Sequence, residues 1–178
     1  MPKLDETRPF LPVRIAVLTV SDTRGLSDDK SGDTLVHMIG QARHEVADRA
    51  IVKDDVEAIR AKVRAWIADP NVDVVISTGG TGFTGRDVTP EAIKPLFEKE
   101  VEGFSTIFHM LSFDKVGTST IQSRACGGLA QGTYIFCLPG SPGACKDAWN
   151  GILVHQLDNR HRPCNLVEIM PRLQEHLT

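Results

Sequence analysis

The sequence predicts an α/β protein, a three-layer αβα sandwich with a mostly parallel central sheet. Three short apolar and β-branched runs support this prediction: 13–20 (VRIAVLTV), 72–78 (VDVVIST) and 133–138 (TYIFCL). Runs of this kind suit strands that are covered on both faces, as the strands of a parallel sheet are. Segments with helical patterns separate the runs, and strands that alternate with helices are typical of a sheet covered by helices on both sides.

The first strand and helix form one unit. A polar, glycine-containing loop at 21–33 follows the strand at 13–20. Apolar residues then recur, so we expect a helix to start near Thr34. Ser31 or Asp33 is the expected N-cap, because a short polar side chain accepts a hydrogen bond from a free backbone N–H there.

The second unit consists of a strand within 44–52 and a helix whose apolar residues recur at helical spacing. Either Asp54 or Asp55 is the expected cap of this helix. The sequence Asp-Pro-Asn at 69–71 ends the helix, since such clusters interrupt helical patterns. The third strand, at 72–78, follows directly.

In the second half, Thr89-Pro90-Glu91 predicts the start of another helix, with a cap residue, a proline at the first position and an acid in the first turn. A further apolar stretch runs over 104–113. The strand at 133–138 then leads into a helix that we expect to extend from Pro142 to Leu157.

Length and composition favour one globular domain over 1–178, with an N-terminal extension at 1–12 and a polar, less regular tail at 158–178. Since 20 Lys and Arg residues face 23 Asp and Glu residues, we expect no nucleic-acid partner. The apolar runs are too short to span a membrane, and the N-terminus has no apolar signal core. We therefore expect a cytoplasmic protein without a membrane partner.

The cysteines and histidines point to no metal centre. Neither a CxxC pair nor a Cys/His cluster with zinc spacing occurs, so no histidine is assigned to a metal. Cys137 lies in an apolar run and is expected to be a small core residue. The four cysteines are Cys126, Cys137, Cys145 and Cys164.

Three loops are candidates for ligand binding, because open α/β sheets bind ligands beyond the carboxyl ends of their strands. They are 21–32, 79–88 and 139–143. In the second loop, Gly80, Gly82 and Gly85 match the spacing G-x-G-x-x-G.

The glycine loop is neither a dinucleotide fingerprint nor a P-loop. In the fingerprint the glycines open a helix, whereas Arg86-Asp87-Val88 here separate them from the helix signal at Thr89. A P-loop needs Lys followed by Ser or Thr, and this chain has Arg86 and Asp87 at those positions. These departures disfavour a nicotinamide-dependent oxidoreductase.

The glycines nevertheless allow backbone N–H groups to converge on an anion, and Thr78 and Thr81 add hydroxyl donors. A carboxylate at Asp87 beside a phosphate would be repelled unless a divalent cation lay between them. Mg²⁺ suits this arrangement, since one or two carboxylates and substrate phosphates usually hold it. The alternative is a glycine-rich turn with an exposed aspartate.

The loop Pro139-Gly140-Ser141-Pro142 joins a strand to a helix, and a helix N-terminus binds phosphate well. Its alternative is a simple strand-to-helix connection. Two anion-binding loops at the same edge of one sheet would suit a ligand with more than one phosphate.

The run 78–91 (TGGTGFTGRDVTPE) resembles the signature of the MoaB/MogA family of molybdenum cofactor biosynthesis proteins, which includes molybdopterin adenylyltransferases. Further matches are 18–24 (LTVSDTR), 123–125 (SRA) and 138–142 (LPGSP). The matches occur in the family's order and cover about 13–157. The N-terminal lead and the segment Arg-Pro-Cys-Asn at 162–165 resemble the MoaB branch in particular.

The resemblance implies Mg²⁺-dependent transfer of AMP from ATP to the terminal phosphate of molybdopterin, with release of pyrophosphate. It also implies that Asp54 and Asp87 are the catalytic and metal-binding acids. Asp54 has helix capping as its alternative role, Asp22 an Asx turn, and Ser123 the capping of a turn. The residues expected to bind substrate or nucleotide are Ser21, Asp22, Thr78, Gly79, Gly80, Thr81, Gly82, Thr89, Pro90, Ser123, Pro139, Gly140, Ser141 and Pro142.

The resemblance further implies a homotrimer, or a homohexamer made of two trimers, and a hand-off of product to a molybdate-inserting enzyme. The stretch 104–113 would be core in a monomer and a subunit contact if exposed. A different class of function is also open: a member of the MoaB branch that binds molybdopterin as a scaffold without catalysis. The presence of both Asp54 and Asp87 favours the enzyme.

Overall fold

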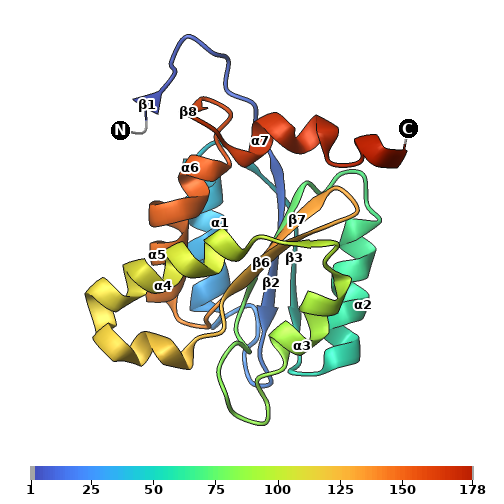
Figure 1. Ribbon diagram of the computed structural model, residues 1–178. Coiled ribbons are helices and arrows are strands. Elements are labelled where there is room, and N and C mark those ends of the chain that lie inside the picture. Colours follow the sequence, from blue (N-terminus) through green and yellow to red (C-terminus); the bar gives the residue numbers. More distant parts are fainter. Residues whose placement is uncertain (1–2, 178) are drawn as a thin grey trace.

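The computed structural model describes residues 3–177 and has a six-stranded sheet at its centre (Figure 1). The strand order is β3-β2-β4-β7-β6-β5, and the first four strands are parallel. Strand β6 runs antiparallel to both of its neighbours, β7 and β5. The strands of this sheet are β2 (Arg14–Val20), β3 (Glu45–Val52), β4 (Val74–Thr78), β5 (Lys99–Glu100), β6 (Cys126–Ala130) and β7 (Thr133–Leu138).

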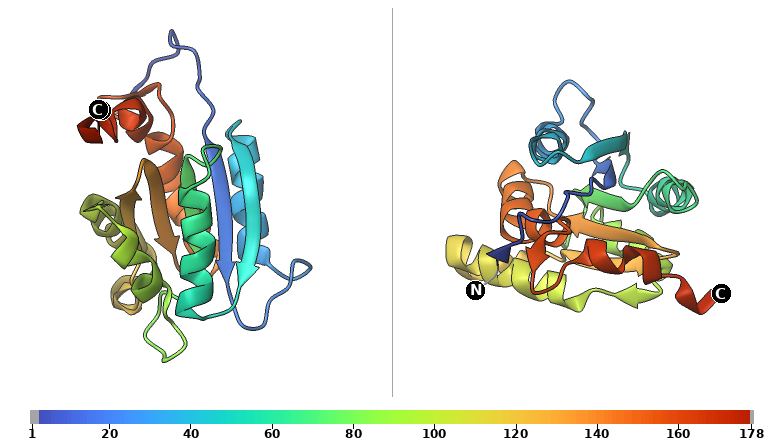
Figure 2. Two further views of the ribbon diagram at one scale, coloured as in Figure 1. Left: turned by 90° about the vertical axis from the view of Figure 1, so that its right-hand side faces the viewer. Right: turned by 90° about the horizontal axis from the view of Figure 1, so that it is seen from above.

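Helices cover both faces of the sheet, which confirms the predicted three-layer αβα sandwich (Figure 2). Helices α1, α4 and α5 pack on one face, and α2 and α3 pack on the other. A π-helical turn at Trp149–Leu153 joins α5 to α6. The helices are α1 (Lys30–Gln41), α2 (Val56–Ile67), α3 (Thr89–Ile93), α4 (Glu102–Val116), α5 (Pro142–Ala148), α6 (Val154–Gln156) and α7 (Leu166–Ile169).

Alternating side chains divide the core into two layers. Along β2, Ile15 and Val17 pack on the α1 side, whereas Ala16 and Leu18 pack on the α2 side. Strand side chains point to opposite faces in turn, so a buried strand must be apolar at every position. This explains why the continuous run at 13–20 is a central strand.

The structure corrects two predicted helix caps. Asp29, rather than Ser31 or Asp33, caps α1 by accepting a hydrogen bond from the backbone N–H of Gly32. Thr89 is the first residue of α3 rather than its cap, and its hydroxyl donates to the carbonyl oxygen of Gly79. For each helix, the local pattern locates the start to within a few residues but leaves several polar side chains as equivalent candidates.

The cap of α2 is Asp55, whose carboxylate accepts from the backbone N–H of Ala58 at 2.8 Å. The alternative role of Asp54 as this cap is therefore wrong. The hairpin partner strand β6 and the short β5 were not predicted, because the segment Cys126–Ala130 (CGGLA) contains two glycines and lacks the β-branched residues that mark a strand.

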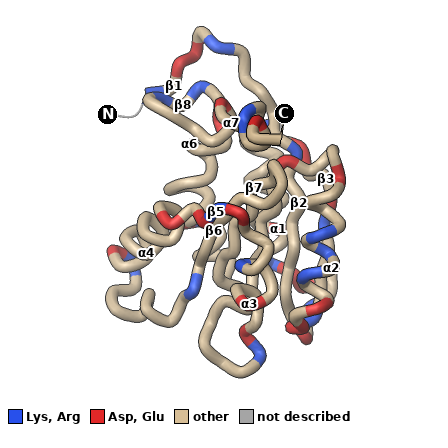
Figure 3. The backbone as a smooth tube through the Cα atoms, turned by 45° about the vertical axis from the view of Figure 1, so that its right-hand side comes forward, with Lys and Arg blue, Asp and Glu red and all other residues tan. Residues whose placement is uncertain are grey.

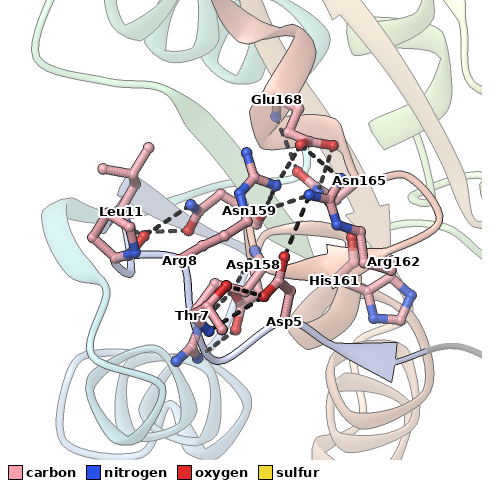
Figure 4. Close-up of polar contacts among 12 residues, drawn as sticks. Asp5, Thr7, Arg8, Leu11, Asp158, Asn159, His161, Arg162, Asn165 and Glu168 are labelled. Carbon is pink, nitrogen blue, oxygen red and sulfur yellow. Dashed lines mark hydrogen bonds and ion pairs between the residues drawn. The ribbon is translucent and has the colours of Figure 1, made fainter.

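The two ends of the chain are joined by a small second sheet. Strand β1 (Lys3–Leu4) pairs antiparallel with β8 (His161–Arg162). Beside it, Arg8 donates to the carbonyl oxygen of Asn159 at 2.7 Å and forms an ion pair with Glu168 (Figure 4). The N-terminal extension thus forms part of the same packed unit as the tail.

The tail is more ordered than its polar sequence suggested. Asn159 and Asn165 are buried, and Val167 joins the core. Asn159 accepts from the backbone N–H of Leu11, and Asn165 caps α7. Amide side chains here supply the hydrogen bonds that the irregular backbone lacks, so polar residues are buried without loss of partners.

Within residues 3–177, no helix is long and apolar enough to cross a membrane.

His44 is a buried titratable group between the N-terminal extension and the core. The residue is 6% exposed, its Nδ1 accepts from the backbone N–H of Val13 at 3.2 Å, and its ring contacts those of Phe10 and Trp149. Burial lowers the pKa of His44 to about 4; the positive charge of Arg43 adds to the shift and Asp158 opposes it.

We expect His44 to make stability depend on pH between about 6.5 and 4. In that range the unfolded chain takes up a proton at this residue that the folded chain does not, so stability falls as the pH falls. The loss is on the order of 2–3 kcal/mol. His44→Asn keeps an acceptor for Val13, and its urea unfolding curves at pH 7 and pH 4.5 should show a smaller pH effect than those of the wild type. An equal pH effect in both proteins would contradict the assignment.

Candidate functional site

Three loops meet at the carboxyl edge of the sheet, because β2, β4 and β7 are parallel neighbours. The loops after β4 and β7 are in direct contact. A Cβ added at Gly140 would lie 3.3 Å from the Cα of Gly79, and the hydroxyl of Thr78 donates to the carbonyl oxygen of Pro139 at 2.8 Å. The structure therefore brings together the two loops that sequence analysis selected as anion-binding.

The glycine loop leaves β4 in a left-handed backbone conformation. Gly79 has φ of +101° and Gly80 has φ of +68°. A Cβ at Gly79 would overlap the carbonyl oxygen of Val20, and one at Gly80 would overlap the hydroxyl of Thr89. Glycine is required here for both backbone angle and space.

The same loop is fixed to the start of α3. Thr89 donates through its hydroxyl to the carbonyl oxygen of Gly79 at 2.8 Å and through its backbone N–H to that of Gly80 at 3.0 Å. The carbonyl oxygens of Gly79 and Gly80 are therefore both directed at Thr89. Thr89 is fully buried and thus shapes the loop rather than facing its mouth, and Pro90 is also buried.

Arg124 is a residue of the site that sequence analysis did not select. Its backbone N–H donates to the carbonyl oxygen of Thr81, and its guanidinium donates to those of Gly82 and Asp87, each at 2.9–3.0 Å. The guanidinium also pairs with Glu91. Arg124 lies within the SRA motif at 123–125 that matches the family. Its contacts with three carbonyl groups of the glycine loop become visible only in the fold.

Ser123 lies beside this arginine. Its hydroxyl accepts from the backbone N–H of Ala125 at 3.3 Å, which is the turn contact named as its alternative role. Ser141 likewise caps α5 by accepting from the backbone N–H of Ala144 at 3.1 Å, with Pro142 at the first helical position. Both serines therefore already have a structural role in the chain.

Acidic residues gather around the glycine loop. A Cβ built at Gly80 would lie 3.2 Å from Oδ1 of Asp54, and one at Gly82 would lie 2.8 Å from Oδ2 of Asp87. The backbone N–H of Asp54 donates to the carboxylate of Asp22 at 3.2 Å. Asp54 and Asp87 thus lie beside one short stretch of backbone, and Asp22 lies next to Asp54.

Their charges are balanced unequally. The guanidinium of Arg86 forms a hydrogen bond and an ion pair with Asp22 and lowers its pKa. Burial raises the pKa of Asp54, and the negative charges of Asp22 and Asp87 raise it further, against an opposing backbone hydrogen bond from Asp22 and the charge of Arg86. An additional positive charge near Asp54 would therefore stabilise its ionised form.

Asp87 is held by its own loop. Its Oδ2 accepts from the backbone N–H of Thr84 at 2.9 Å and from the Thr84 hydroxyl at 2.7 Å. Within residues 3–177, no three His, Cys, Asp or Glu side chains are grouped so as to hold a metal ion on their own. Two carboxylates completed by substrate phosphates match the usual Mg²⁺ site, so Asp54 and Asp87 fit this ion.

The loop after β2 is stabilised by a buried carboxylate that sequence analysis also missed. Asp29 is fully buried and accepts from the hydroxyl of Thr19 at 2.7 Å, from Gly32 at 3.0 Å and from Arg49 at 2.9 Å. Burial alone would raise the pKa of Asp29, but these hydrogen bonds outweigh it and the pKa is lowered. In the sequence, Asp29 is one of several polar residues in the loop at 21–33, and nothing in the local pattern distinguishes it from the others.

This loop also contacts the third one. The hydroxyl of Ser31 donates to the carbonyl oxygen of Gly140 at 2.7 Å, and Arg24 donates to the same oxygen at 3.2 Å. The hydroxyl of Ser21 accepts from the backbone N–H of Arg24 at 3.2 Å. A cavity of about 430 Å³ opens beside Ser21 and Asp22.

Over the described residues as a whole, acidic and basic residues are interspersed (Figure 3).

Comparison with known proteins identifies the family. The model of the family described as "Probable molybdopterin binding domain" matches residues 16–159. The chain is 56% identical over 156 residues to Molybdenum cofactor biosynthesis protein B of Escherichia coli strain K12, covering 88% of this chain and 92% of that protein. The protein of the same name from Bacillus subtilis strain 168 is 46% identical over 146 residues, covering 82% and 86%.

A solved structure agrees with the sequence matches. The crystal structure of a Molybdenum cofactor biosynthesis protein B superposes with a TM-score of 0.85 at 38% identity, covering 94% of this chain and 99% of that one. The family match spans all three loops described above. The chain therefore belongs to the MoaB/MogA family of molybdenum cofactor biosynthesis proteins, as its glycine-loop signature had indicated.

Proposed function

We propose that this protein acts in molybdenum cofactor biosynthesis by transferring AMP from ATP to the terminal phosphate of molybdopterin, with Mg²⁺ as cofactor and pyrophosphate as second product. Family membership supports the pathway and molybdopterin as the partner. The observation that supports the reaction is the position of Asp54 and Asp87 beside the backbone of Gly80 and Gly82, which follows the left-handed turn at Gly79 and Gly80.

In the proposed reaction, a terminal phosphate oxygen of molybdopterin attacks the α-phosphorus of ATP. A new P–O bond forms, the bond to the bridging oxygen breaks, and pyrophosphate departs. Catalysis of this kind consists mainly of positioning two anions and neutralising their charge. The chain contributes backbone N–H groups of the glycine loop and the N-terminus of α5 for this purpose.

Asp54 and Asp87 would hold Mg²⁺, which supplies positive charge to the ATP phosphates and to the departing pyrophosphate. Arg124 keeps the loop between them in shape through the carbonyl oxygens of Gly82 and Asp87. Arg86 is engaged by Asp22, so its charge offsets one carboxylate of the cluster.

A protein that binds molybdopterin without adenylylating it is the alternative function, and the hand-off of product to a molybdate-inserting enzyme fits either. Incubation with molybdopterin, ATP and Mg²⁺ distinguishes the two. Adenylylated pterin together with pyrophosphate supports the enzyme, whereas pterin binding without either product supports the scaffold.

We also propose that the protein assembles as a homotrimer or as a homohexamer of two trimers. Helix α4 has apolar residues on both sides: Phe104 and Phe108 are buried, whereas Met110, Phe113 and Val116 are more than half exposed. The predicted stretch 104–113 is thus partly core and partly surface. An exposed apolar face of this kind favours a contact between subunits.

The first prediction from the proposed function concerns Asp87. We expect Asp87→Asn to reduce AMP transfer by about a hundredfold or more, because one strong electrostatic contribution to the transition state is lost. The amide retains an oxygen that accepts from Thr84, so the loop is preserved. Molybdopterin binding should persist, since less negative charge faces the phosphate.

Asp55→Asn is the matched control, because Asp55 is adjacent to Asp54 but caps α2, a role that asparagine fills equally well. Asp54→Asn should behave like Asp87→Asn. Product formation is followed by chromatography of the pterin and by a pyrophosphate assay. Transfer at the wild-type rate in Asp87→Asn would exclude the proposed role.

The second prediction concerns the two anion-binding loops. Gly80→Val and Gly140→Val should weaken binding of ATP or molybdopterin about tenfold or more, equal to about 1.4 kcal/mol. Valine disfavours the φ of +68° at Gly80, where its Cβ would also overlap the hydroxyl of Thr89. At Gly140 its Cβ would lie 3.3 Å from the Cα of Gly79. Gly85→Ala is the control, since its added Cβ meets no atom within 4 Å. Unchanged affinity in both valine variants would show that the two loops are turns without a role in ligand binding.

The third prediction concerns assembly. Light scattering of dilute protein should give three or six times the 19.5 kDa mass of one chain. Phe113→Glu should shift the mass toward that of one chain, because it places a charge in the contact. Leu177→Glu, at an exposed position in the tail, should leave the mass unchanged. A wild-type mass of one chain would contradict the proposal.

A further inference from the structure

Two cysteines face each other on the antiparallel strands β6 and β7. Cys126 and Cys137 are directly opposite in the strand register, and both side chains belong to the core layer under α2 and α3. Cys126 is 4% exposed and Cys137 is fully buried. Residues directly opposite on neighbouring strands have side chains on the same face of the sheet, so the two thiols are adjacent.

The backbone identifies the type of pair. Gly127 and Leu129 direct their carbonyl oxygens toward the other neighbour of β6, where they accept from Val101 and Glu98. Backbone groups alternate in direction along a strand, so those of Cys126 point toward β7, and Cys126 and Cys137 form a hydrogen-bonded pair. The Cα atoms of such a pair are about 5.5 Å apart, which is within the usual range for a disulfide.

We propose that Cys126 and Cys137 form a dithiol that hydrogen peroxide oxidises to a disulfide across β6 and β7. The other cysteines do not compete for this bond. Cys145 packs on the opposite face of the sheet, where its sulfur contacts the Thr78 hydroxyl, and Cys164 is exposed in the tail.

The surroundings give the two thiols different roles. The hydrogen bond with Cys137 lowers the pKa of Cys126, with the Lys94 ammonium acting in the same direction, and Cys126 is the partner nearer to solvent. The pKa of Cys137 is raised by that hydrogen bond and by burial. Cys126 is therefore the attacking sulfur and Cys137 the resolving one, since the thiolate is the nucleophile.

The reaction balances in two steps. The Cys126 thiolate attacks one peroxide oxygen; an S–O bond forms, the O–O bond breaks, and the departing hydroxide takes the proton that Cys126 released. The Cys137 sulfur then attacks the sulfenic sulfur, forming the S–S bond as the S–O bond breaks. The hydroxide that leaves takes the proton of Cys137, so two waters form while two thiols lose two electrons to the peroxide.

The bond would affect the candidate site because β6 begins and β7 ends at the edge of the sheet where the site lies. Opposite residues have Cβ atoms about 4.5–5.5 Å apart, and a disulfide requires about 3.8 Å, so the strands must shift. Arg124, two residues before Cys126, donates to the carbonyl oxygens of Gly82 and Asp87. Disulfide formation should therefore loosen the glycine loop.

Mass spectrometry tests the bond directly. Trypsin releases residues 125–146 as one peptide, since Lys146 is the first Lys or Arg after Arg124. After peroxide treatment, the unlabelled peptide should be about 2 Da lighter than the same peptide from reduced protein. When the treated protein is denatured and labelled with iodoacetamide before digestion, the peptide should carry one label, on Cys145. Fragment ions from cleavage between Cys126 and Cys137 should appear only after reduction with dithiothreitol.

Variants identify the partners. The disulfide should form in Cys145→Ser and Cys164→Ser and be absent from Cys126→Ala and from Cys137→Ala, with circular dichroism showing which variants fold. If Cys137→Ala does not fold, Cys126→Ala and the wild-type fragment ions decide the outcome. Three labelled cysteines in the peptide, at a peroxide concentration that oxidises Cys164, would overturn the proposal.

Hydrogen exchange tests the link to the site. In the oxidised wild type, amides of 81–87 should exchange faster than in the reduced protein, and dithiothreitol should reverse the change. Cys126→Ala should show no response to peroxide in this segment. Equal exchange in the two forms of the wild type would exclude the coupling to the glycine loop. This readout is independent of AMP transfer, so its result does not depend on the proposed reaction.

Discussion

The candidate site depends on a close approach of backbone at the end of β4. Gly79 donates to the carbonyl oxygen of Leu138 in β7, and its Cα faces the carbonyl oxygen of Val20 at the end of β2. No side chain fits between these strands at this level. The chain must therefore leave the sheet through two left-handed glycines, and this exit brings Gly80 beside Asp54 and is followed by Gly82, which lies beside Asp87.

Two carboxylates at this edge, the fully buried Asp29 and the half-buried Asp54, differ in how their negative charge is balanced. Asp29 has a hydroxyl, a backbone N–H and a guanidinium as partners, so its negative charge is stabilised by the protein. Asp54 has negative neighbours instead. A protein tolerates an unbalanced carboxylate where function supplies the missing charge, and this contrast distinguishes a structural acid from a candidate catalytic one.

The sequence predicted the layers of the fold and the positions of the main strands, because burial on both faces leaves a strong local pattern in β2, β4 and β7. It also selected the two loops that the structure brings into contact. The hairpin strand β6 was missed, since its glycines adjoin the aromatic rings of Phe97 and Phe136 and so carry no strand signal of their own. Arg124 and Asp29 were missed because their roles depend on contacts between segments distant in sequence.

The pairing of β1 with β8 has a consequence for how this domain can be joined to others. Both described ends of the chain lie at the end of the molecule opposite the glycine loop (Figure 1). A protein fused to either end would therefore extend away from the candidate site and leave its entrance open.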